Sequence, residues 1–509
     1  MTEVPVPPSP DRSTGPRGSL RTIIDSFADI RALVVGEAIL DSYLSGPGRG
    51  LSREAPVPIV DVSDRTDAPG GAANTAANVR AVGARVTFLS VIGDDPDAMR
   101  LKRELQARGI PTDDLVVETG RRTLAKHRLV ASGQMIARFD QGTTDPLSSA
   151  TEVSFAKRLA DLWSRADVVI VSDYRYGVMS PGVRRALAEL REGDDRPLVV
   201  DARELRSYAS TRPTAVKPNY EEAVALLELP AVEGTRARIE QIHGCGDRLV
   251  DLTGARIAAV TLGADGAVVF ERGRAPYRTF TRPTQNSRAT GAGDTFVGVL
   301  GLSLASGAET EEAADLASAA SAVVVGKEVT SVCTAPELKR YVAAESKYIS
   351  GAIGLRQLAQ SLHQERKRIV FTNGCFDILH RGHIAHLAQA KTLGDVLVVG
   401  LNTDDSVRRL KGHGRPINTL EDRVEILSAL DSVDHIVPFN SDTPIDLIAA
   451  LRPHLYVKGG DYSKESLPET PMVERLAGEV VILPLISDSS TSGIVERIRA
   501  GSGAKQRRR

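Results

Sequence analysis

The stretch RIVFTNGCFDILHRGHIAHLAQAKTLGDVLVVGLN, from Arg368 to Asn402, decides the fold of the C-terminal third of the chain. Its apolar start predicts a buried strand that ends at Thr372, followed by a loop, a helix from about Gly382 and a second strand, DVLVVGLN. His380 and His383 stand three positions apart where the helix is expected to begin, so they share one face. Helix amides and two imidazoles can bind a triphosphate and the charge that builds on its α-phosphorus. The pattern predicts a phosphate site centred on His380, Gly382 and His383.

Two other interpretations of the histidine pair are open. A zinc site would require a third ligand and often a nearby Glu, as in HExxH, which is absent here, and the imidazoles could also simply cap the helix. Cys375, in the same loop, is expected to pack because nothing near it in the sequence favours a thiolate. The phosphate site is the interpretation that the glycine loop and the histidine spacing favour.

Strands and helices alternate on both sides of this stretch. Downstream, the runs HIVPF, LYVKGGD and EVVILP complete an α/β domain over residues 365–509, after a linker at 341–364. Upstream, short β-branched runs separated by helical stretches begin at Arg31 and predict a parallel sheet with helices on both faces, in a domain of residues 21–340. More polar, alternating segments at Glu54 to Asp67 and Thr123 to Asp140 predict a small additional sheet. Residues 1–20 are rich in Pro, Ser and Gly and are expected to be a disordered leader.

Composition excludes several classes of function. The 64 Lys and Arg residues nearly cancel the 65 Asp and Glu residues of this 509-residue chain, so no overall field favours nucleic acid or an anionic membrane. The basic end KQRRR is too short to supply many phosphate contacts. Three separated cysteines indicate neither a disulfide framework nor a zinc ribbon and favour a reducing, cytoplasmic setting. No long apolar run or signal-like leader is present, so we expect no membrane span.

A second phosphate-binding pattern is SRATGAGDTFVG, residues 287–298. Gly291, Ala292 and Gly293 allow a tight turn whose N–H groups can face one phosphate at a helix start. Asp294, at the same turn, can take the proton from an attacking hydroxyl while the amides stabilise the transferred phosphoryl group. Taken alone, the turn could also be an ordinary helix cap.

Together with PGGAANTAANVRAVGARVTFLSVIGDD, Pro69 to Asp95, this turn resembles the ribokinase-like sugar kinase family over about residues 30–340. The resemblance implies an α/β/α sandwich with a small β lid. It also implies that this domain uses ATP and Mg²⁺, and a monovalent cation is a further candidate ligand. It implies that the sugar is held by Asp41, Gly70, Gly71 and Asn74. In KPNYEEA, Asn219 and Glu222 match the family's motif for Mg·ATP, with Glu222 acting on the metal indirectly.

The local stretches EAPVPIV, TLAKHRL, VSDY and VVVGKEVTS resemble the heptose 7-phosphate kinase branch of that family. On this interpretation Lys126, Arg128 and Arg138 grip the distal phosphate of the sugar, since fixed cations suit a dianion. Each could equally be a surface charge, and Arg53 is a weaker candidate. The chain also departs from close relatives, with Arg288 where an acidic residue is common and with Tyr176 and Arg203 where Lys is common.

The stretch TNGCFDILHRGH resembles the cytidylyltransferase-like nucleotidyltransferases, with a Rossmann-like HxGH domain over about residues 365–500. The resemblance implies that later motifs, RLKGHGRP, VKGGD and SSTSGIVERI, also contact the nucleotide. Asp404 and Arg423 are weaker candidates. The residues implied in nucleotide binding, besides the two histidines, are Asn373, Gly374, Phe376, Asp377, Gly382, Lys411, Arg415, Lys458, Asp461, Ser490, Thr491 and Ser492.

In this order the two halves resemble a family that joins a heptose 7-phosphate kinase to a heptose 1-phosphate adenylyltransferase. The resemblance implies ATP and sugar phosphates as ligands, a separate phosphatase that acts between the two steps, and a homodimer formed through the kinase domain. Two alternatives are open. One is a sugar kinase fused to a cytidylyltransferase for another sugar or polyol phosphate, and the other is an N-terminal domain that only binds sugar or dimerises.

Overall fold

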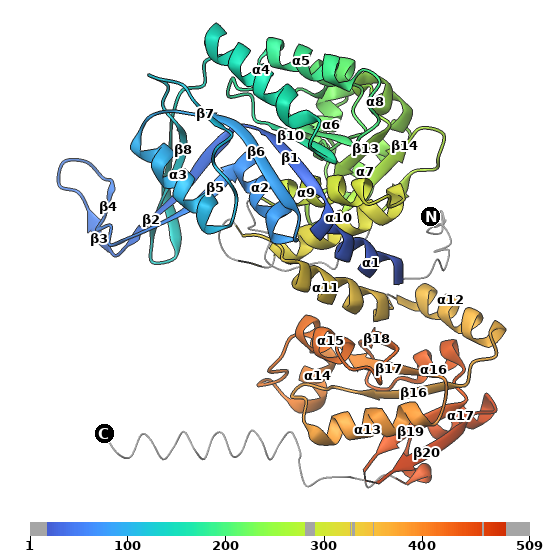
Figure 1. Cartoon of the computed structure of the whole chain (residues 1–509). Coiled ribbons are helices and arrows are strands. Elements are labelled where there is room, and N and C mark those ends of the chain that lie inside the picture. Colours follow the sequence, from blue (N-terminus) through green and yellow to red (C-terminus); the bar gives the residue numbers. More distant parts are fainter. Residues whose placement is uncertain are drawn as a thin grey trace. The chain divides into compact units, whose positions relative to one another are not determined.

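The computed structural model describes residues 18–279, 291–325, 327, 331–349, 351–460 and 463–484. The chain forms two compact units, Met1–Lys339 and Arg340–Arg509 (Figure 1). The first helix, α1, spans Gly18–Ser26, so it begins within the last three residues of the expected leader. The expected linker is largely helical, because α11 (Ala335–Lys347) and α12 (Gly351–Gln364) occupy it. In the part of the chain that the structure describes, no helix is long and apolar enough to cross a membrane.

A nine-stranded sheet forms the centre of the first unit, in the order β15-β14-β13-β12-β11-β10-β1-β6-β7. The strands from β13 to β7 in this order are parallel, and β14 and β15 are added antiparallel. Their bounds are β1 Arg31–Gly36, β6 Arg85–Ile92, β7 Leu115–Val117, β10 Val168–Asp173, β11 Leu198–Ala202, β12 Ala215–Val216, β13 Ile257–Thr261, β14 Ala267–Glu271 and β15 Tyr277–Arg278.

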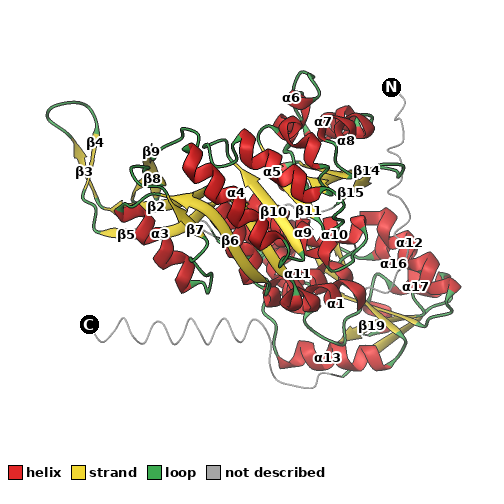
Figure 2. Cartoon of the chain, turned by 45° about the horizontal axis from the view of Figure 1, so that its top comes forward, coloured by secondary structure: helices red, strands yellow, loops and turns green. Residues whose placement is uncertain are grey.

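Helices cover both faces of this sheet, as Figure 2 shows. One face carries α2 (Ala72–Ala81), α9 (Ala292–Ala305) and α10 (Thr310–Val325), and α9 contacts the other two. Gly301 of α9 packs so closely that a Cβ there would lie 3.1 Å from the Ile170 side chain. On the other face α4, α5 and α8 pack on alternate strand residues such as Leu33 and Val35. The helices not yet given bounds are α3 Pro96–Ala107, α4 Ser149–Trp163, α5 Pro181–Arg191, α6 Tyr220–Leu226, α7 Thr235–His243 and α8 Gly246–Thr253.

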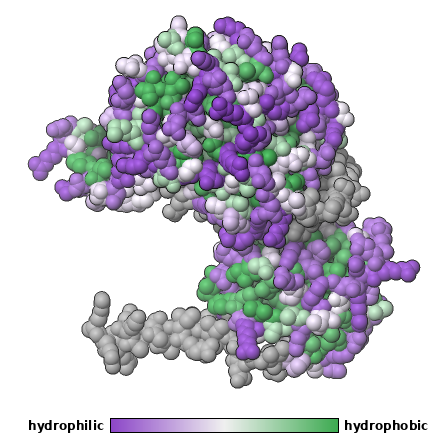
Figure 3. All heavy atoms as spheres, viewed as in Figure 1, coloured by the Kyte–Doolittle hydropathy of each residue, from purple (hydrophilic) through white to green (hydrophobic). Residues whose placement is uncertain are grey.

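A four-stranded sheet, ordered β5-β2-β8-β9, stands beside the main one. It contains β5 (Asp64–Gly71), β8 (Leu124–Ala131) and β9 (Gln134–Gln141), from the segments expected to form a small sheet. It also contains β2 (Ala38–Gly46), which follows β1 directly and which the sequence did not assign to this sheet. A two-stranded ribbon of β3 (Gly48–Leu51) and β4 (Pro58–Val60) projects from it, and Figure 3 shows apolar side chains on this ribbon.

The second unit is built on a parallel five-stranded sheet, ordered β18-β17-β16-β19-β20. The strand β16 (Ile369–Gly374) runs two residues past the expected end at Thr372, because Asn373 and Gly374 pair with Gly400 and Leu401. The other strands are β17 Val396–Asn402, β18 His435–Phe439, β19 Leu455–Gly459 and β20 Glu479–Leu483. The helices are α12, α13 Arg381–Thr392, α14 Asp404–Lys411, α15 Leu420–Ser428, α16 Ile445–Leu451 and α17 Thr470–Arg475. Separate apolar clusters cover the two faces of the sheet.

Candidate functional site

Asp294 lies in the first turn of α9, directly after the glycine turn that the sequence singles out. Gly291 has a left-handed backbone (φ +101°), which favours glycine, and a Cβ there would lie 2.5 Å from Nδ2 of Asn74. Three side chains donate to the Asp294 carboxylate: Asn74 Nδ2 at 2.7 Å, the Tyr174 hydroxyl at 2.7 Å and Thr75 Oγ1 at 3.3 Å. Burial raises the pKa of Asp294, against these donors. The carboxylate is therefore fixed in place and suited to accept a proton.

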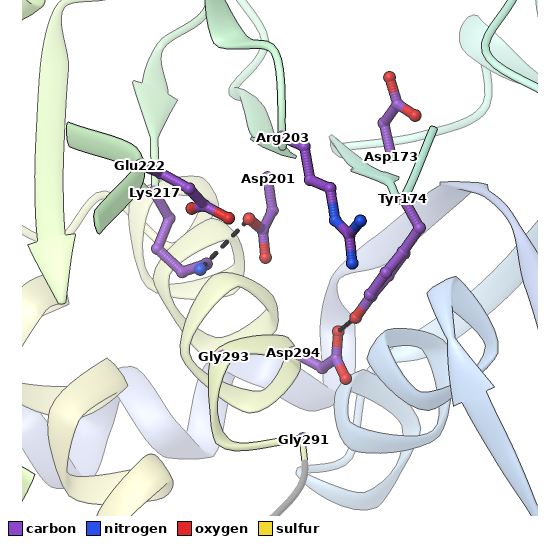
Figure 4. A pocket seen from close by; sticks show the side chains of 9 residues that line it. All are labelled: Asp173, Tyr174, Asp201, Arg203, Lys217, Glu222, Gly291, Gly293 and Asp294. Carbon is purple, nitrogen blue, oxygen red and sulfur yellow. Dashed lines mark hydrogen bonds and ion pairs between the residues drawn. The ribbon is translucent and has the colours of Figure 1, made fainter. Parts of the chain in front are cut away.

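A cavity of about 200 Å³ opens in front of Asp294, lined by residues from the carboxyl ends of several parallel strands (Figure 4). Lys217, after β12, pairs with Asp201 of β11 at 3.2 Å. Its Nζ atom would lie 3.4 Å from a Cβ on Gly293, so a cation faces the helix start. Burial raises the pKa of Asp201 to about 7, although Lys217 opposes the shift. Helix amides and a buried lysine together form a site suited to a polyphosphate.

Asn219 and Glu222 form a reciprocal capping box at the start of α6. The Glu222 N–H donates to Asn219 Oδ1 at 2.8 Å, and the Asn219 N–H donates to Glu222 Oε2 at 2.9 Å. Glu222 also lines the cavity, so the pair both caps the helix and places a carboxylate at the site. Among the residues with described coordinates, no group of three acidic, His or Cys side chains is arranged to hold a metal.

The candidate sugar residues lie where the small sheet meets the start of α2. Asp41 of β2 is buried and accepts a hydrogen bond from Arg128 Nη1 of β8 at 2.7 Å. Gly70 approaches Asp41 so closely that a Cβ there would lie 2.6 Å from Oδ2. Gly71 has φ +57° and begins α2, which carries Asn74. The four residues implied in sugar binding are therefore adjacent to one another and, through Asn74, to Asp294.

Lys126 lies on β8 beside the rings of Tyr174 and Tyr176, with Nζ 5.3 and 5.6 Å from their centroids. Burial lowers its pKa, partly offset by Asp41. Arg138 of β9 is half exposed and forms an ion pair with Asp140 at 2.6 Å. Lys126 and Arg128 therefore lie on the sugar side of the site, and Arg128 and Arg138 each form an ion pair with a carboxylate, Asp41 and Asp140 respectively. Arg53 is exposed in the loop between β3 and β4.

Sequence reasoning missed Tyr174, Lys217 and Asp201 and treated Arg203, which lines the cavity, only as a departure. A signal was available, because each follows or ends an apolar run, VVIVSDY, PLVVDA or TAVKPN. In parallel sheets the ligand site lies outside the carboxyl ends of the strands, where such residues converge. Tyr176 and Arg203, which stand where Lys is common in relatives, likewise follow strand ends, those of β10 and β11. Arg288 lies outside the described residues.

The second candidate site surrounds the start of α13. His380 is the N-terminal cap residue, and the N–H of His383 donates to its carbonyl at 2.9 Å. The two imidazoles stack with centroids 3.8 Å apart, and Phe376 lies 5.3 Å from His383. Burial, with nearby His380 and Lys411, lowers the pKa of His383 to about 4. Neutral imidazoles and the free amides of the first turn, at Arg381 and Gly382, therefore face a common region.

Other predicted nucleotide-binding residues lie around these histidines. Lys411 ends α14 and Lys458 lies near the end of β19, and both contribute positive charge at the Cys375 loop. Asn373 Oδ1 accepts from the Tyr456 hydroxyl at 2.8 Å. A Cβ on Gly374 would lie 3.0 Å from the Phe376 ring. The structure thus brings Asn373, Gly374, Phe376, Gly382, Lys411 and Lys458 together with the histidine pair.

Asp377 and Arg415 have a more structural setting than the sequence suggests. The buried Asp377 carboxylate pairs with the Arg415 guanidinium and accepts from the N–H groups of Ile417 and Asn418 at 2.7 and 3.0 Å. Asp377 would therefore contribute to nucleotide binding indirectly, by holding this loop in place. The two weaker candidates, Asp404 and Arg423, also bind within the protein, since the buried Arg423 donates to Asp404 at 2.7 Å and to three backbone carbonyls.

His386, one turn after His383, was not singled out in the sequence. Its Nε2 lies 3.2 Å from Thr372 Oγ1, and its Nδ1 would lie 2.8 Å from a Cβ on Gly459. It therefore separates the end of β16 from the glycine loop after β19. Burial raises the pKa of Cys375, as expected for a packed thiol. Asp461, Ser490, Thr491 and Ser492 lie outside the described residues.

Comparisons with known proteins match each half of the chain to a family. Residues 29–338 match the pfkB family of carbohydrate kinases, and residues 371–497 match the cytidylyltransferase-like family. The "Bifunctional protein HldE" of Pelobacter propionicus is 38% identical over 492 residues, which covers 95% of this chain and 99% of that protein. The protein of the same name from Alcanivorax borkumensis is 38% identical, covering 94% and 98%. Phosphofructokinase-2 from Escherichia coli, solved in complex with potassium, has a TM-score of 0.50 at 20% identity, covering 62% of this chain and 98% of that one.

Proposed function

The chain belongs to the family of bifunctional HldE proteins, and on this basis we propose that its two units catalyse two steps of ADP-heptose biosynthesis. The expected combination of a ribokinase-like sugar kinase and a cytidylyltransferase-like nucleotidyltransferase is confirmed. In the first step, D-glycero-β-D-manno-heptose 7-phosphate is phosphorylated at O1 by ATP. In the second, heptose 1-phosphate takes AMP from ATP, which gives ADP-heptose and pyrophosphate. The observation that carries the proposal is the buried Asp294, held by Asn74 and Tyr174 at a glycine-rich helix start.

In the kinase step Asp294 takes the proton of the O1 hydroxyl while O1 attacks the γ-phosphorus of ATP and ADP leaves. The amides of Gly291, Ala292 and Gly293 and the ammonium of Lys217 face the charge on the transferred group. Burial supports this role, because the raised pKa of Asp294 makes its carboxylate a stronger base. The sugar is held by Asp41, Gly70, Gly71 and Asn74, with its 7-phosphate directed to Lys126, Arg128 and Arg138.

Mg²⁺ completes the kinase site in this proposal. The donors present fit this ion, since Asp201 and Glu222 supply carboxylate oxygens at the cavity and Mg²⁺ prefers oxygen ligands and retains several waters. The ion neutralises charge on the ATP phosphates when bound. Glu222 would act on the ion indirectly, as the family motif implies, while its Oε2 accepts the Asn219 N–H. We include a monovalent cation in the kinase domain, and kinase rates measured in KCl and in tetramethylammonium chloride test it.

In the transferase step the sugar 1-phosphate oxygen attacks the α-phosphorus of ATP and pyrophosphate leaves. His380, His383 and the first-turn amides of α13 bind the phosphates as hydrogen-bond donors, while Lys411 and Lys458 supply charge. No covalent intermediate is needed. Arg415, held by Asp377, closes the same side of the site, and Asp461, Ser490, Thr491 and Ser492 belong to the proposal through the family motifs alone.

The two steps do not connect directly, because the kinase product carries a phosphate at O7 as well as at O1. A separate phosphatase must therefore remove the 7-phosphate. Incubation of the full chain with heptose 7-phosphate, ATP and Mg²⁺ should give the bisphosphate alone, and addition of that phosphatase should give ADP-heptose, both detected by mass spectrometry. No consumption of ATP by the unaltered chain would refute the kinase assignment. Turnover of heptose 1-phosphate with CTP but not ATP would favour the cytidylyltransferase alternative.

The Asp294→Asn variant separates the kinase from a domain that only binds. We expect this variant to abolish bisphosphate formation and to leave pyrophosphate release from heptose 1-phosphate and ATP unchanged, because the second unit has its own core. The exposed Asp113→Asn serves as a matched control in the same unit. Equal activity of D294N and the unaltered chain would support the binding or dimerisation module instead.

We also propose a cytoplasmic homodimer formed through the kinase domain. Large apolar side chains are exposed on the β3–β4 ribbon and on β9, among them Leu51, Val57, Ile59 and Phe139. Exposed patches of this kind are typical of association surfaces. Light scattering of the full chain and of Leu51→Asp tests the dimer, and a monomeric mass for the unaltered chain would contradict it.

A further inference from the structure

Glu37, directly after β1, connects the two elements that hold Asp294. Its backbone carbonyl accepts from the N–H of Ala72 at 3.0 Å, at the start of the helix that carries Asn74. Its side-chain Oε2 accepts from the N–H of Tyr174 at 2.8 Å. Asn74 and Tyr174 then donate to different oxygens of the Asp294 carboxylate. Both supports of the base therefore start from one residue.

The carboxylate of Glu37 also holds the turn after β10. Oε1 accepts from the N–H of Tyr176 at 3.2 Å, so the side chain binds two amides of the same turn. Between these amides Arg175 has a left-handed backbone, with φ +62°. A turn with such a residue persists only where its surroundings fix it. Glu37 supplies that fixation from inside the molecule, since none of its surface is exposed.

The turn decides where two aromatic side chains lie. Figure 4 shows Tyr174 extending from the end of the strand to Asp294. The rings of Tyr174 and Tyr176 both face the Lys126 ammonium on the sugar side. A shift of this turn would therefore move a donor away from the base and change the setting of a candidate phosphate-binding lysine at the same time.

We infer that Glu37 is a positioning residue for the kinase reaction, which acts on Asp294 through the Tyr174 hydroxyl without touching either substrate. The inference rests on the proposed kinase function. A carboxylate is required because two N–H donors point at one side chain, and an amide offers only one acceptor oxygen. Burial and the nearby Asp173 carboxylate raise the pKa of Glu37 to about 7, so this acceptor is held at an electrostatic cost. Such a cost is consistent with a carboxylate whose role is to hold the turn that carries Tyr174.

A double-mutant cycle on the full chain tests this role. Glu37→Gln and Tyr174→Phe should each lower the kinase kcat about 10- to 100-fold, with the KM for ATP changed by less than about threefold. Because both act through one hydrogen bond to Asp294, the double variant should be no slower than the slower single variant. Pyrophosphate release by the second unit should stay unchanged in every variant and reports the amount of intact chain.

The exposed Glu189→Gln on α5 is the control for charge removal and should match the unaltered chain. If Glu37→Gln does not fold, Glu37→Asp replaces it, since the shorter side chain withdraws from both amides and predicts the same non-additivity. Independent, multiplying effects of the two substitutions would overturn the inference, as would a Glu37→Gln variant with normal kcat. If the unaltered chain has no kinase activity, the proposed function fails instead.

Discussion

Substitution of Gly70 by alanine tests how the sugar residues are arranged. A Cβ at this position would lie 2.6 Å from Oδ2 and 2.9 Å from Cγ of Asp41. Normal contact requires about 3.5 Å, so the carboxylate must retreat by roughly 1 Å. Asp41 has little freedom to do so, because it is buried and its other oxygen accepts from Arg128 at 2.7 Å. We expect the retreat to break that hydrogen bond or to withdraw the carboxylate from the sugar.

The loss of one charge-assisted hydrogen bond corresponds to about 1.5 to 3 kcal/mol. The kinase kcat/KM for heptose 7-phosphate should therefore fall roughly 10- to 100-fold, mainly through the KM for the sugar. The measurement is the initial rate of ADP formation at a series of sugar concentrations and saturating ATP. The KM for ATP should change little, because the nucleotide cavity is lined by residues of other strands.

Gly48→Ala is the matched control, since Gly48 also lies in a strand of the first unit and a Cβ there would be 3.9 Å from the Ala131 side chain. It should leave every kinetic constant within about twofold of the unaltered chain. A Gly70→Ala variant with an unchanged KM for the sugar would refute the placement of Asp41 in the sugar site. If Gly70→Ala also lowers the thermal unfolding temperature of the chain substantially, the loss of activity would point to damaged packing instead.

Three further predictions concern the second unit. His383→Asn should lower pyrophosphate release roughly 100- to 1,000-fold and leave the kinase rate unchanged. Burial lowers the pKa of His383 to about 4 in the folded chain, whereas the pKa in the unfolded chain is about 6.5. The stability that the neutral ring contributes is therefore fully present above about pH 6.5 and is lost as the pH falls to about 4. Thermal unfolding between pH 7.5 and 4 should thus depend less on pH in His383→Asn. Asp377→Ala, which leaves the Arg415 guanidinium unpaired, should cost about 3 to 5 kcal/mol in urea unfolding, and less than 1 would contradict the clamp.

The sequence was sufficient for the parts of each site that lie within one motif. Gly291 and Asp294 share one turn, and His380 and His383 share one helix start, so their proximity follows from local geometry. The alternation of strands and helices likewise predicted a parallel sheet in the first unit and an α/β domain in the second. Even Asn74 and Asp294, which are hydrogen-bonded across 220 positions, could be paired through the resemblance to a known family.

Residues that meet only through the order of strands in the sheet were missed, although each stands at the end of an apolar run. Tyr174, Asp201 and Lys217 lie at or just after the carboxyl ends of three different strands, and they converge because β10, β11 and β12 are neighbours in the sheet. The assignment of β2 to the small sheet was missed for a similar reason, since its partners β5 and β8 lie far along the chain. Asp377 shows the converse difficulty. Its motif indicates a ligand contact, whereas its oxygens are taken by a loop about 40 residues later.

Burial shifts the pKa values of Asp294 and His383 in opposite directions. It raises the pKa of Asp294 and lowers the pKa of His383, and in both cases it disfavours the charged form. At Asp294 three donors oppose the effect, so a carboxylate can persist as a base beside an anionic substrate. At His383 the neighbouring His380 and Lys411 add to it, so the imidazole is neutral at physiological pH. The proposed kinase site therefore depends on a charged base kept in place by hydrogen bonds. The proposed transferase site instead depends on neutral imidazole donors, and the negative charge of the ATP phosphates is balanced by Lys411 and Lys458. Removal of either lysine should therefore weaken ATP binding more than removal of His383.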